Sequence, residues 1–236
     1  MKNPIIVALD VPAAEQAIAL AEQLAGLVGA VKIGSELFTI AGPDIVRRLR
    51  AAGTPVFLDL KFHDIPNTVA KAVASATRVG IDMLTIHTGG GSEMMRAAEA
   101  SAQRTAAELG RTAPLVLGVT VLTSMDAPAL REVGCGDEPA AQVTRLATLA
   151  VSSGLRGLVC SPLEVCALRT LLGPAVQLVI PGIRTGGEQP DDQKRTLTPR
   201  EAMDAGAHWL VIGRPIYAAP DPREAARRIL ASLVPQ

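Results

Sequence analysis

The stretch TPVFLDLKFHDIPNTV, residues 54–69, places an acid, a base and a second acid directly after an apolar run. In a β-strand, side chains two positions apart share a face, so Asp59 and Lys61 are expected to project together from the end of a strand over 56–60. The leucines on either side of Asp59 would then face the other way. The stretch therefore predicts a buried strand whose last residues carry charge on one face.

The second acid of this stretch, Asp64, lies beyond the expected strand, at a turn into a helix. Asn67 or Thr68 is predicted to cap that helix, because either side chain can accept a hydrogen bond from a free backbone N–H group. Neighbouring carboxylates stabilise the charged form of a lysine, so Lys61 is expected to be an ammonium proton donor in a fixed field. An isolated Asp-x-Lys is more often a surface ion pair, and the rest of the chain decides between the two interpretations.

Short apolar runs alternate with amphipathic, alanine-rich segments along the whole chain. Eight runs are expected to be strands: Pro4 to Leu9, Val31 to Gly34, Val56 to Leu60, Met83 to His87, Leu115 to Leu122, Gly157 to Cys160, Gln177 to Ile180, and Trp209 to Gly213. This alternation predicts an α/β protein, a (β/α)8 TIM barrel formed as a single domain over 1–236. An open doubly wound sheet is the alternative, but no G-x-G-x-x-G motif follows the first run.

Charge and cysteine content narrow the choice of partners and compartment. The chain carries 23 basic and 23 acidic residues, so it has no general electrostatic footprint for nucleic acid or an anionic membrane. Its three cysteines include no C-x-x-C pair, which argues against a thiolate metal site and a disulfide framework. The N-terminal apolar run is too short for a signal peptide, and no run is long enough to span a membrane. We expect a soluble, cytoplasmic protein that binds neither nucleic acid nor membrane.

Polar residues gather where the expected strands end, which is where barrels of this type carry their sites. They are Asp10, Lys32, Asp59 with Lys61, His87, Thr123 with Ser124, Pro181 to Arg184, and Gly213 with Arg214. A lysine that faces a barrel interior is costly to bury unless it is paired, so Lys32 is predicted to reach Asp10 or Asp59. His87 is expected to hold neighbouring loops rather than to titrate during a reaction.

The loops after the seventh and eighth strands are the common phosphate site of such barrels, because backbone N–H groups converge there. Gly213 would let the backbone approach an anion closely, and Arg214 could bind two phosphate oxygens at once. The long irregular stretch over 184–198 has a Gly-Gly base and is predicted to be a mobile lid. Together these features predict an enzyme that acts on a phosphorylated metabolite.

Five separated motifs resemble the orotidine 5'-phosphate decarboxylase family. They are DLKFHDIPNT at 59–68, VTVLTSM at 119–125, PGIR at 181–184, DQKR at 192–195 and VIGRPI at 211–216. The similarity extends in order from Asp10 to the final helix. It implies conversion of orotidine 5'-phosphate to uridine 5'-phosphate and CO2, the last step of de novo UMP synthesis, without cofactor or metal.

The resemblance also implies a role for each matching residue. Lys61 would donate the proton that replaces the carboxylate at C6, within a charged array of Lys32, Asp59, Lys61 and Asp64. A homodimer with shared active sites is implied, in which Asp64, Ile65 and Thr68 come from the partner protomer. The remaining substrate-binding residues would be Asp10 and Lys32 at the ribose, Thr123 and Ser124 at the pyrimidine, Pro181 in the PGIR motif, and Arg184, Gln193, Gly213 and Arg214 at the phosphate and the closing loop.

Two rival functions share these features. A magnesium-dependent enzyme similar to 3-keto-L-gulonate 6-phosphate decarboxylase has the same D-x-K-x-x-D spacing. A non-catalytic barrel that binds a phosphorylated ligand is the rival from another class. The second rival leaves the charge cluster around Lys61 without a use, although burying such a cluster lowers stability.

Overall fold

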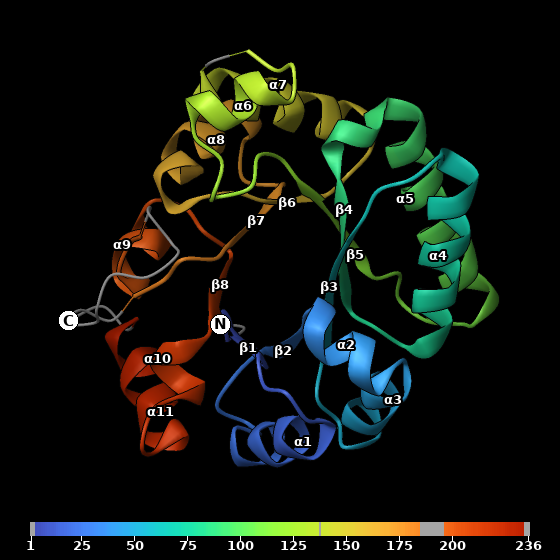
Figure 1. The fold of residues 1–236 in the computed structure, drawn as a ribbon. Coiled ribbons are helices and arrows are strands. Elements are labelled where there is room, and N and C mark those ends of the chain that lie inside the picture. Colours follow the sequence, from blue (N-terminus) through green and yellow to red (C-terminus); the bar gives the residue numbers. More distant parts are fainter. Residues whose placement is uncertain (1–2, 137, 185–195, 234–236) are drawn as a thin grey trace.

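The computed structural model describes residues 3–136, 138–184 and 196–233, and its strands form a closed parallel barrel (Figure 1). The strands are β1 (Ile5–Ala8), β2 (Ala30–Ile33), β3 (Val56–Phe62), β4 (Met83–His87), β5 (Leu115–Val119), β6 (Gly157–Val159), β7 (Gln177–Ile180) and β8 (Trp209–Ile212). Each strand pairs with the next one along the chain, and β8 pairs with β1 through Leu210 and Ile5. The predicted (β/α)8 barrel is therefore confirmed. The open-sheet alternative is wrong, because β1 has a neighbour on both sides.

The helices surround the strands as an outer layer (Figure 1). They are α1 (Ala14–Gln23), α2 (Ser35–Ala41), α3 (Asp44–Ala51), α4 (Pro66–Val79), α5 (Gly91–Glu108), α6 (Ala127–Glu132), α7 (Pro139–Ser152), α8 (Val165–Leu172), α9 (Pro199–Asp204), α10 (Arg214–Tyr217) and α11 (Pro222–Ser232), with 3-10 turns η1 (Thr88–Gly90) and η2 (Pro162–Glu164). Within the described ranges, no helix combines the length and the apolar character needed to span a bilayer. The domain limits of 1–236 stay a prediction, because both chain ends lie outside those ranges.

Alternation along the strands produces two separate apolar cores. In β3, Phe57 belongs to a cluster inside the barrel, whereas Leu58 and Leu60 pack in the larger cluster between the barrel and the helices. The inner cluster is Ile6, Ala8, Ala30, Phe57, Met83, Leu115, Leu117, Val179, Trp209 and Val211. Lys32 pairs in register with Phe57, so it continues the inward-facing set toward the carboxyl ends of the strands. The barrel thus changes from apolar to charged at the end where sites are found.

The end of β3 differs from the sequence prediction in two ways. The strand continues to Phe62 instead of ending at residue 60, and its pairing with β4 shifts after Leu58. The predicted cap at Asn67 or Thr68 is wrong, because α4 begins at Pro66 and Ile65 is its N-cap, without a side-chain hydrogen bond. Proline suits the first helical position, where its missing N–H group is not needed.

Candidate active site

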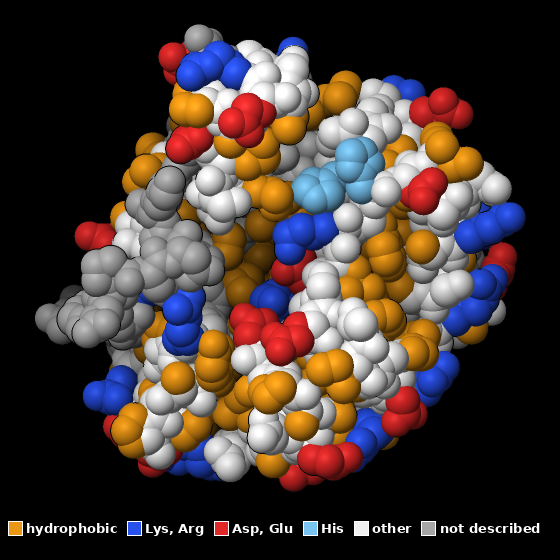
Figure 2. Space-filling view, in the orientation of Figure 1, with side chains coloured by type: hydrophobic (Ala, Val, Ile, Leu, Met, Phe, Trp, Pro, Cys, Tyr) orange, Lys and Arg blue, Asp and Glu red, His pale blue; other side chains and the backbone are white. Residues whose placement is uncertain are grey.

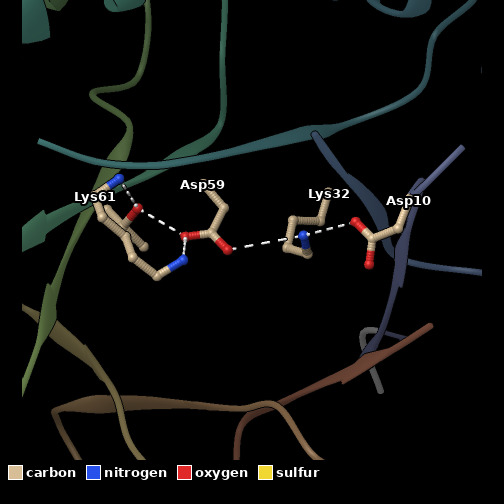
Figure 3. Close-up of polar contacts among 5 residues, drawn as sticks. Asp10, Lys32, Asp59 and Lys61 are labelled. Atoms are coloured by element: carbon tan, nitrogen blue, oxygen red, sulfur yellow. Dashed lines mark hydrogen bonds and ion pairs between the residues drawn. The ribbon is translucent and has the colours of Figure 1, made fainter. Parts of the chain in front are cut away.

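Four charged side chains, from β2, β3 and the segment that follows β1, form one row across the carboxyl end of the barrel (Figure 3). Lys32 lies between two acids, with its Nζ 3.3 Å from Asp10 Oδ1 and 3.8 Å from Asp59 Oδ2. Lys61 Nζ lies 2.9 Å from the other Asp59 oxygen, Oδ1. The sequence predicted that Lys32 would reach Asp10 or Asp59, and it reaches both. Acid and base alternate along the row, so each lysine is next to a carboxylate.

The position of Asp59 favours its ionised form. Only 15% of this side chain is exposed, and burial acts to raise its pKa. The charges of Lys32 and Lys61, together with hydrogen bonds from Lys61 and Thr85, outweigh burial and hold the Asp59 pKa below its usual value. Asp59 is therefore a carboxylate at neutral pH, and it forms ion pairs with both lysines.

This row faces a cavity of about 390 Å³ at the mouth of the barrel. Figure 2 shows basic and acidic side chains side by side in the central hollow, with histidine at its rim. Nine residues predicted from the sequence line the cavity: Asp10, Lys32, Asp59, Lys61, Thr123, Pro181, Arg184, Gly213 and Arg214. The charged row and the predicted phosphate residues thus share one cavity.

The other predicted site residues are not brought to this cavity by the chain itself. Asp64, Ile65, Thr68 and Ser124 are exposed and are absent from the cavity lining. Asp64 instead accepts a hydrogen bond of 2.6 Å from the Ile65 N–H group through Oδ1. Gln193, and with it most of the predicted lid over 184–198, lies outside the described residues.

Several residues of the site were missed at the sequence level. Thr85 in β4 is fully buried, and its hydroxyl contacts Asp59 at 2.9 Å, but in the sequence it is an ordinary β-branched strand residue. Tyr217 in α10 also lines the cavity. A Cβ at Gly34 would lie 3.3 Å from Lys32 Nζ, so this glycine leaves room for the ion pair between Lys32 and Asp10.

Cys160 also lines the cavity. Burial raises the pKa of its thiol, which favours the unreactive neutral form.

The charged row does not have the composition of a metal site. Among the residues that the structure describes, no group of three His, Cys, Asp or Glu side chains is placed to hold a metal ion. The two carboxylates of the row, Asp10 and Asp59, both have Lys32 as a neighbour. An ammonium group thus holds the position between them that a divalent cation would need.

Two histidines lie beside the row at the ends of β3 and β4. The ring centroids of His63 and His87 are 5.5 Å apart, with a tilt of 44°. Burial lowers the pKa of His87, the positive fields of His63 and Lys61 lower it further, and Asp59 opposes them in part. Because folding favours the neutral ring, the stability that His87 contributes is complete above its unfolded-state pKa of about 6.5 and is lost as the pH falls through the folded-state pKa.

We therefore expect His87→Gln to reduce the loss of stability in mild acid. The variant has no group at this position that must stay neutral, so its free energy of unfolding should fall less between about pH 7 and about pH 5 than that of the wild type. Urea unfolding at both pH values measures the difference. Equal losses in both proteins would mean that His87 is not held neutral by the fold.

Fold and site together define a class: a barrel enzyme with a charged site at the carboxyl ends of its strands. The sequence matches the family described as "Orotidine 5'-phosphate decarboxylase / HUMPS family" over residues 3–229. The chain belongs to this family. The resemblance stated from the motifs is thus confirmed, as is the prediction of an enzyme, a carboxy-lyase.

Individual relatives agree with the family match. The orotidine 5'-phosphate decarboxylases of Opitutus terrae and Paramagnetospirillum magneticum are 56% and 54% identical to the chain, each over 233 residues that cover 99% of both proteins. The crystal structure of orotidine 5'-phosphate decarboxylase from Lactobacillus acidophilus matches with a TM-score of 0.88 at 38% identity, over 98% of this chain and 99% of that one. An uncharacterised conserved protein from Geobacillus kaustophilus matches with a TM-score of 0.85 at 37% identity, over 98% and 100%.

Proposed function

We propose that the protein converts orotidine 5'-phosphate to uridine 5'-phosphate and CO2 in the cytoplasm, as the last step of de novo pyrimidine synthesis. Lys61 is the proton donor to C6, and no metal or organic cofactor takes part. The single observation that carries this proposal is the Lys61 ammonium, paired with Asp59 at 2.9 Å and facing a cavity that also holds Arg214. A proton source and a phosphate ligand are thereby available to one small molecule.

The reaction explains why a lysine is needed. Loss of CO2 from C6 of the pyrimidine leaves a carbanion whose electron pair lies in the ring plane, where no electron sink can accept it. An ammonium group beside C6 stabilises this developing charge and then transfers a proton to it. A histidine would be only partly protonated at neutral pH, whereas the ordinary pKa of a lysine lies well above neutral pH. Lys61 thus combines the electrostatic and the acid role.

Asp59 and Lys32 set the field in which Lys61 acts. Asp59 shares its oxygens between the two lysines, which keeps both ammonium groups at fixed positions. Such an arrangement is organised before the substrate arrives, so the enzyme does not have to reorient dipoles during the reaction. Asp10 and Lys32 are also placed to bind ribose hydroxyl groups, since a carboxylate accepts and an ammonium donates hydrogen bonds.

The phosphate is proposed to bind at the side of the cavity formed after β7 and β8. Arg184 follows β7, and Gly213 and Arg214 follow β8, where α10 begins. A guanidinium can donate two parallel hydrogen bonds to phosphate oxygens. Binding energy from this remote group can contribute to catalysis when it helps to hold the ring at the charged row. Gln193 and closure of the lid over 184–198 belong to this part of the proposal.

We also propose that the active protein is a homodimer in which each site takes residues from both protomers. Asp64 is exposed and does not line its own cavity, and the neighbouring Ile65 is 67% exposed. An exposed apolar side chain beside a carboxylate is suited to an interface in which the carboxylate enters another site. Asp64, Ile65 and Thr68 would complete the partner's cavity. Separately from the dimer, Thr123 and the adjacent Ser124 are proposed to lie against the pyrimidine.

The Lys32 ammonium between Asp10 and Asp59 disfavours the first rival, the magnesium-dependent decarboxylase. A non-catalytic ligand-binding barrel is disfavoured by burial of Asp59, because a buried carboxylate is costly to keep charged. Neither rival explains the two lysines of the row as well as carbanion protonation does.

The proposed function is tested by following loss of orotidine 5'-phosphate absorbance with the purified protein in excess EDTA. We expect full activity with and without the chelator, and uridine 5'-phosphate as the product. Activity that is lost in EDTA and restored by magnesium would support the metal-dependent rival. Binding of the nucleotide without any turnover would support the ligand-binding rival.

A further inference from the structure

The pairing between β3 and β4 contains an irregularity that includes Lys61. Leu58 pairs with Leu84, and the next pair is Phe62 with Ile86. Three residues of β3, 59 to 61, therefore lie opposite a single residue of β4, which is Thr85. Extra residues in one strand leave backbone groups without their usual partners in the sheet.

Lys61 lies within this bulge in an unfavourable backbone conformation. Its φ is +50°, and no other non-glycine residue in the described part of the chain has a positive φ. Side chains other than glycine rarely adopt this conformation, because Cβ crowds the backbone. Such a conformation persists only where surrounding contacts impose it, and it occurs preferentially at functional sites.

The Thr85 hydroxyl supplies two of those contacts. It accepts a hydrogen bond of 2.9 Å from the Lys61 backbone N–H group and donates one of 2.9 Å to Asp59 Oδ1. The side chain is fully buried, so the hydroxyl depends on these partners in place of water. One oxygen atom thus links the backbone of the proposed proton donor to the carboxylate that pairs with its ammonium.

The same contacts fix the rotation of the Asp59 carboxylate. Oδ1 receives hydrogen bonds from both Thr85 and Lys61 Nζ, which leaves Oδ2 facing Lys32 at 3.8 Å. Without the hydroxyl, the carboxylate could turn about its terminal bond, and the Lys61 N–H group would lose its acceptor. Both changes would move the ammonium relative to the substrate.

We propose that Thr85 is a positioning residue for the reaction: its buried hydroxyl holds the Lys61 backbone and the Asp59 carboxylate in the arrangement that directs the Lys61 ammonium into the cavity. This inference rests on the proposed role of Lys61 as the proton donor. Thr85 itself is absent from the cavity lining, so it acts through its two neighbours and not on the substrate.

The test compares Thr85→Val, which keeps the shape but removes the hydroxyl, with Thr85→Ser, which keeps the hydroxyl. Thr77→Val is the matched control, because Thr77 is also buried and its hydroxyl bonds only to the Val73 carbonyl within α4. We expect Thr85→Val to lower kcat by about 30-fold, in the range caused by a misplaced reacting group, while KM and the affinity for uridine 5'-phosphate change by less than about threefold. Thr85→Ser should restore kcat to within about threefold of the wild type, and Thr77→Val should leave it unchanged.

Three outcomes would overturn the inference: near-normal kcat in Thr85→Val, an equal loss in Thr77→Val, or a loss of nucleotide affinity as large as the loss of kcat. If Thr85→Val fails to fold, the Ser variant and a crystal structure of a Thr85→Ala protein decide, because the inference requires the Lys61 φ or its ammonium position to change in Thr85→Ala. Failure of the inference is distinguishable from failure of the proposed function. If the proposed role of Lys61 is wrong, a Lys61→Ala protein retains turnover. If only the inference about Thr85 is wrong, that protein is inactive.

Discussion

Replacement of Lys61 by alanine is expected to abolish turnover of orotidine 5'-phosphate. The Lys61 ammonium is paired with Asp59 at 2.9 Å and lines the cavity. Because 36% of the Lys61 side chain is exposed, the ammonium is available to the substrate. Its loss removes both the stabilisation of the carbanion and the proton that ends the reaction. Affinity for uridine 5'-phosphate should stay within about tenfold of the wild type, since the phosphate and ribose contacts remain.

Steady-state assays and titration with the product nucleotide measure these two quantities on the same protein. Lys71→Ala provides the control, because Lys71 lies on α4 away from the cavity lining and should leave both quantities unchanged. Near-normal turnover of the Lys61→Ala protein would remove Lys61 from the mechanism. A similarly large loss of affinity for uridine 5'-phosphate would instead indicate that the substitution damages the whole site.

Mixing two inactive variants is expected to restore activity. If Asp64 acts in the partner's cavity, a heterodimer of Lys61→Ala and Asp64→Ala chains contains one site in which both residues are intact. Random reassociation of equal amounts makes half of the dimers mixed, each with one working site of two, so about a quarter of wild-type activity should return. The assay follows substrate loss after the separately purified variants are dissociated together and reassociated.

The matched control for this experiment is a mixture of Lys61→Ala and Asp59→Ala chains. These two residues belong to the same row in one protomer, so no arrangement of the chains rebuilds an intact site. Activity should therefore stay absent. If the Asp64 mixture also stays inactive although heterodimers are shown to form, Asp64 acts within its own chain or not at all.

The sequence predicted much of the barrel because local patterns determine it. The alternation of Phe57 with Leu58 and Leu60 follows from strand geometry, and the structure places these side chains on opposite faces as expected. The pairing of Lys32 with an acid was predictable because an unpaired ammonium is too costly to bury. Both arguments use only the residue and its immediate neighbours.

Most of what the sequence did not predict depends on contacts between distant segments. The bulge that gives Lys61 its positive φ is set by the register between β3 and β4, and nothing in the order of residues marks it. Thr85 is a usual strand residue until its hydroxyl is found between Asp59 and Lys61. The start of α4 was misjudged because Pro66 at the first helical position takes precedence over the capping preference of Asn67 and Thr68.

A crystal structure with uridine 5'-phosphate bound tests the central claim most directly. The claim is that the row of Asp10, Lys32, Asp59 and Lys61 places one ammonium against the carbon that loses CO2. We predict Lys61 Nζ within about 3.5 Å of C6, still paired with Asp59, and the phosphate bound by Arg214. A bound nucleotide whose C6 faces away from Lys61, with another group in contact with that carbon, would contradict the account.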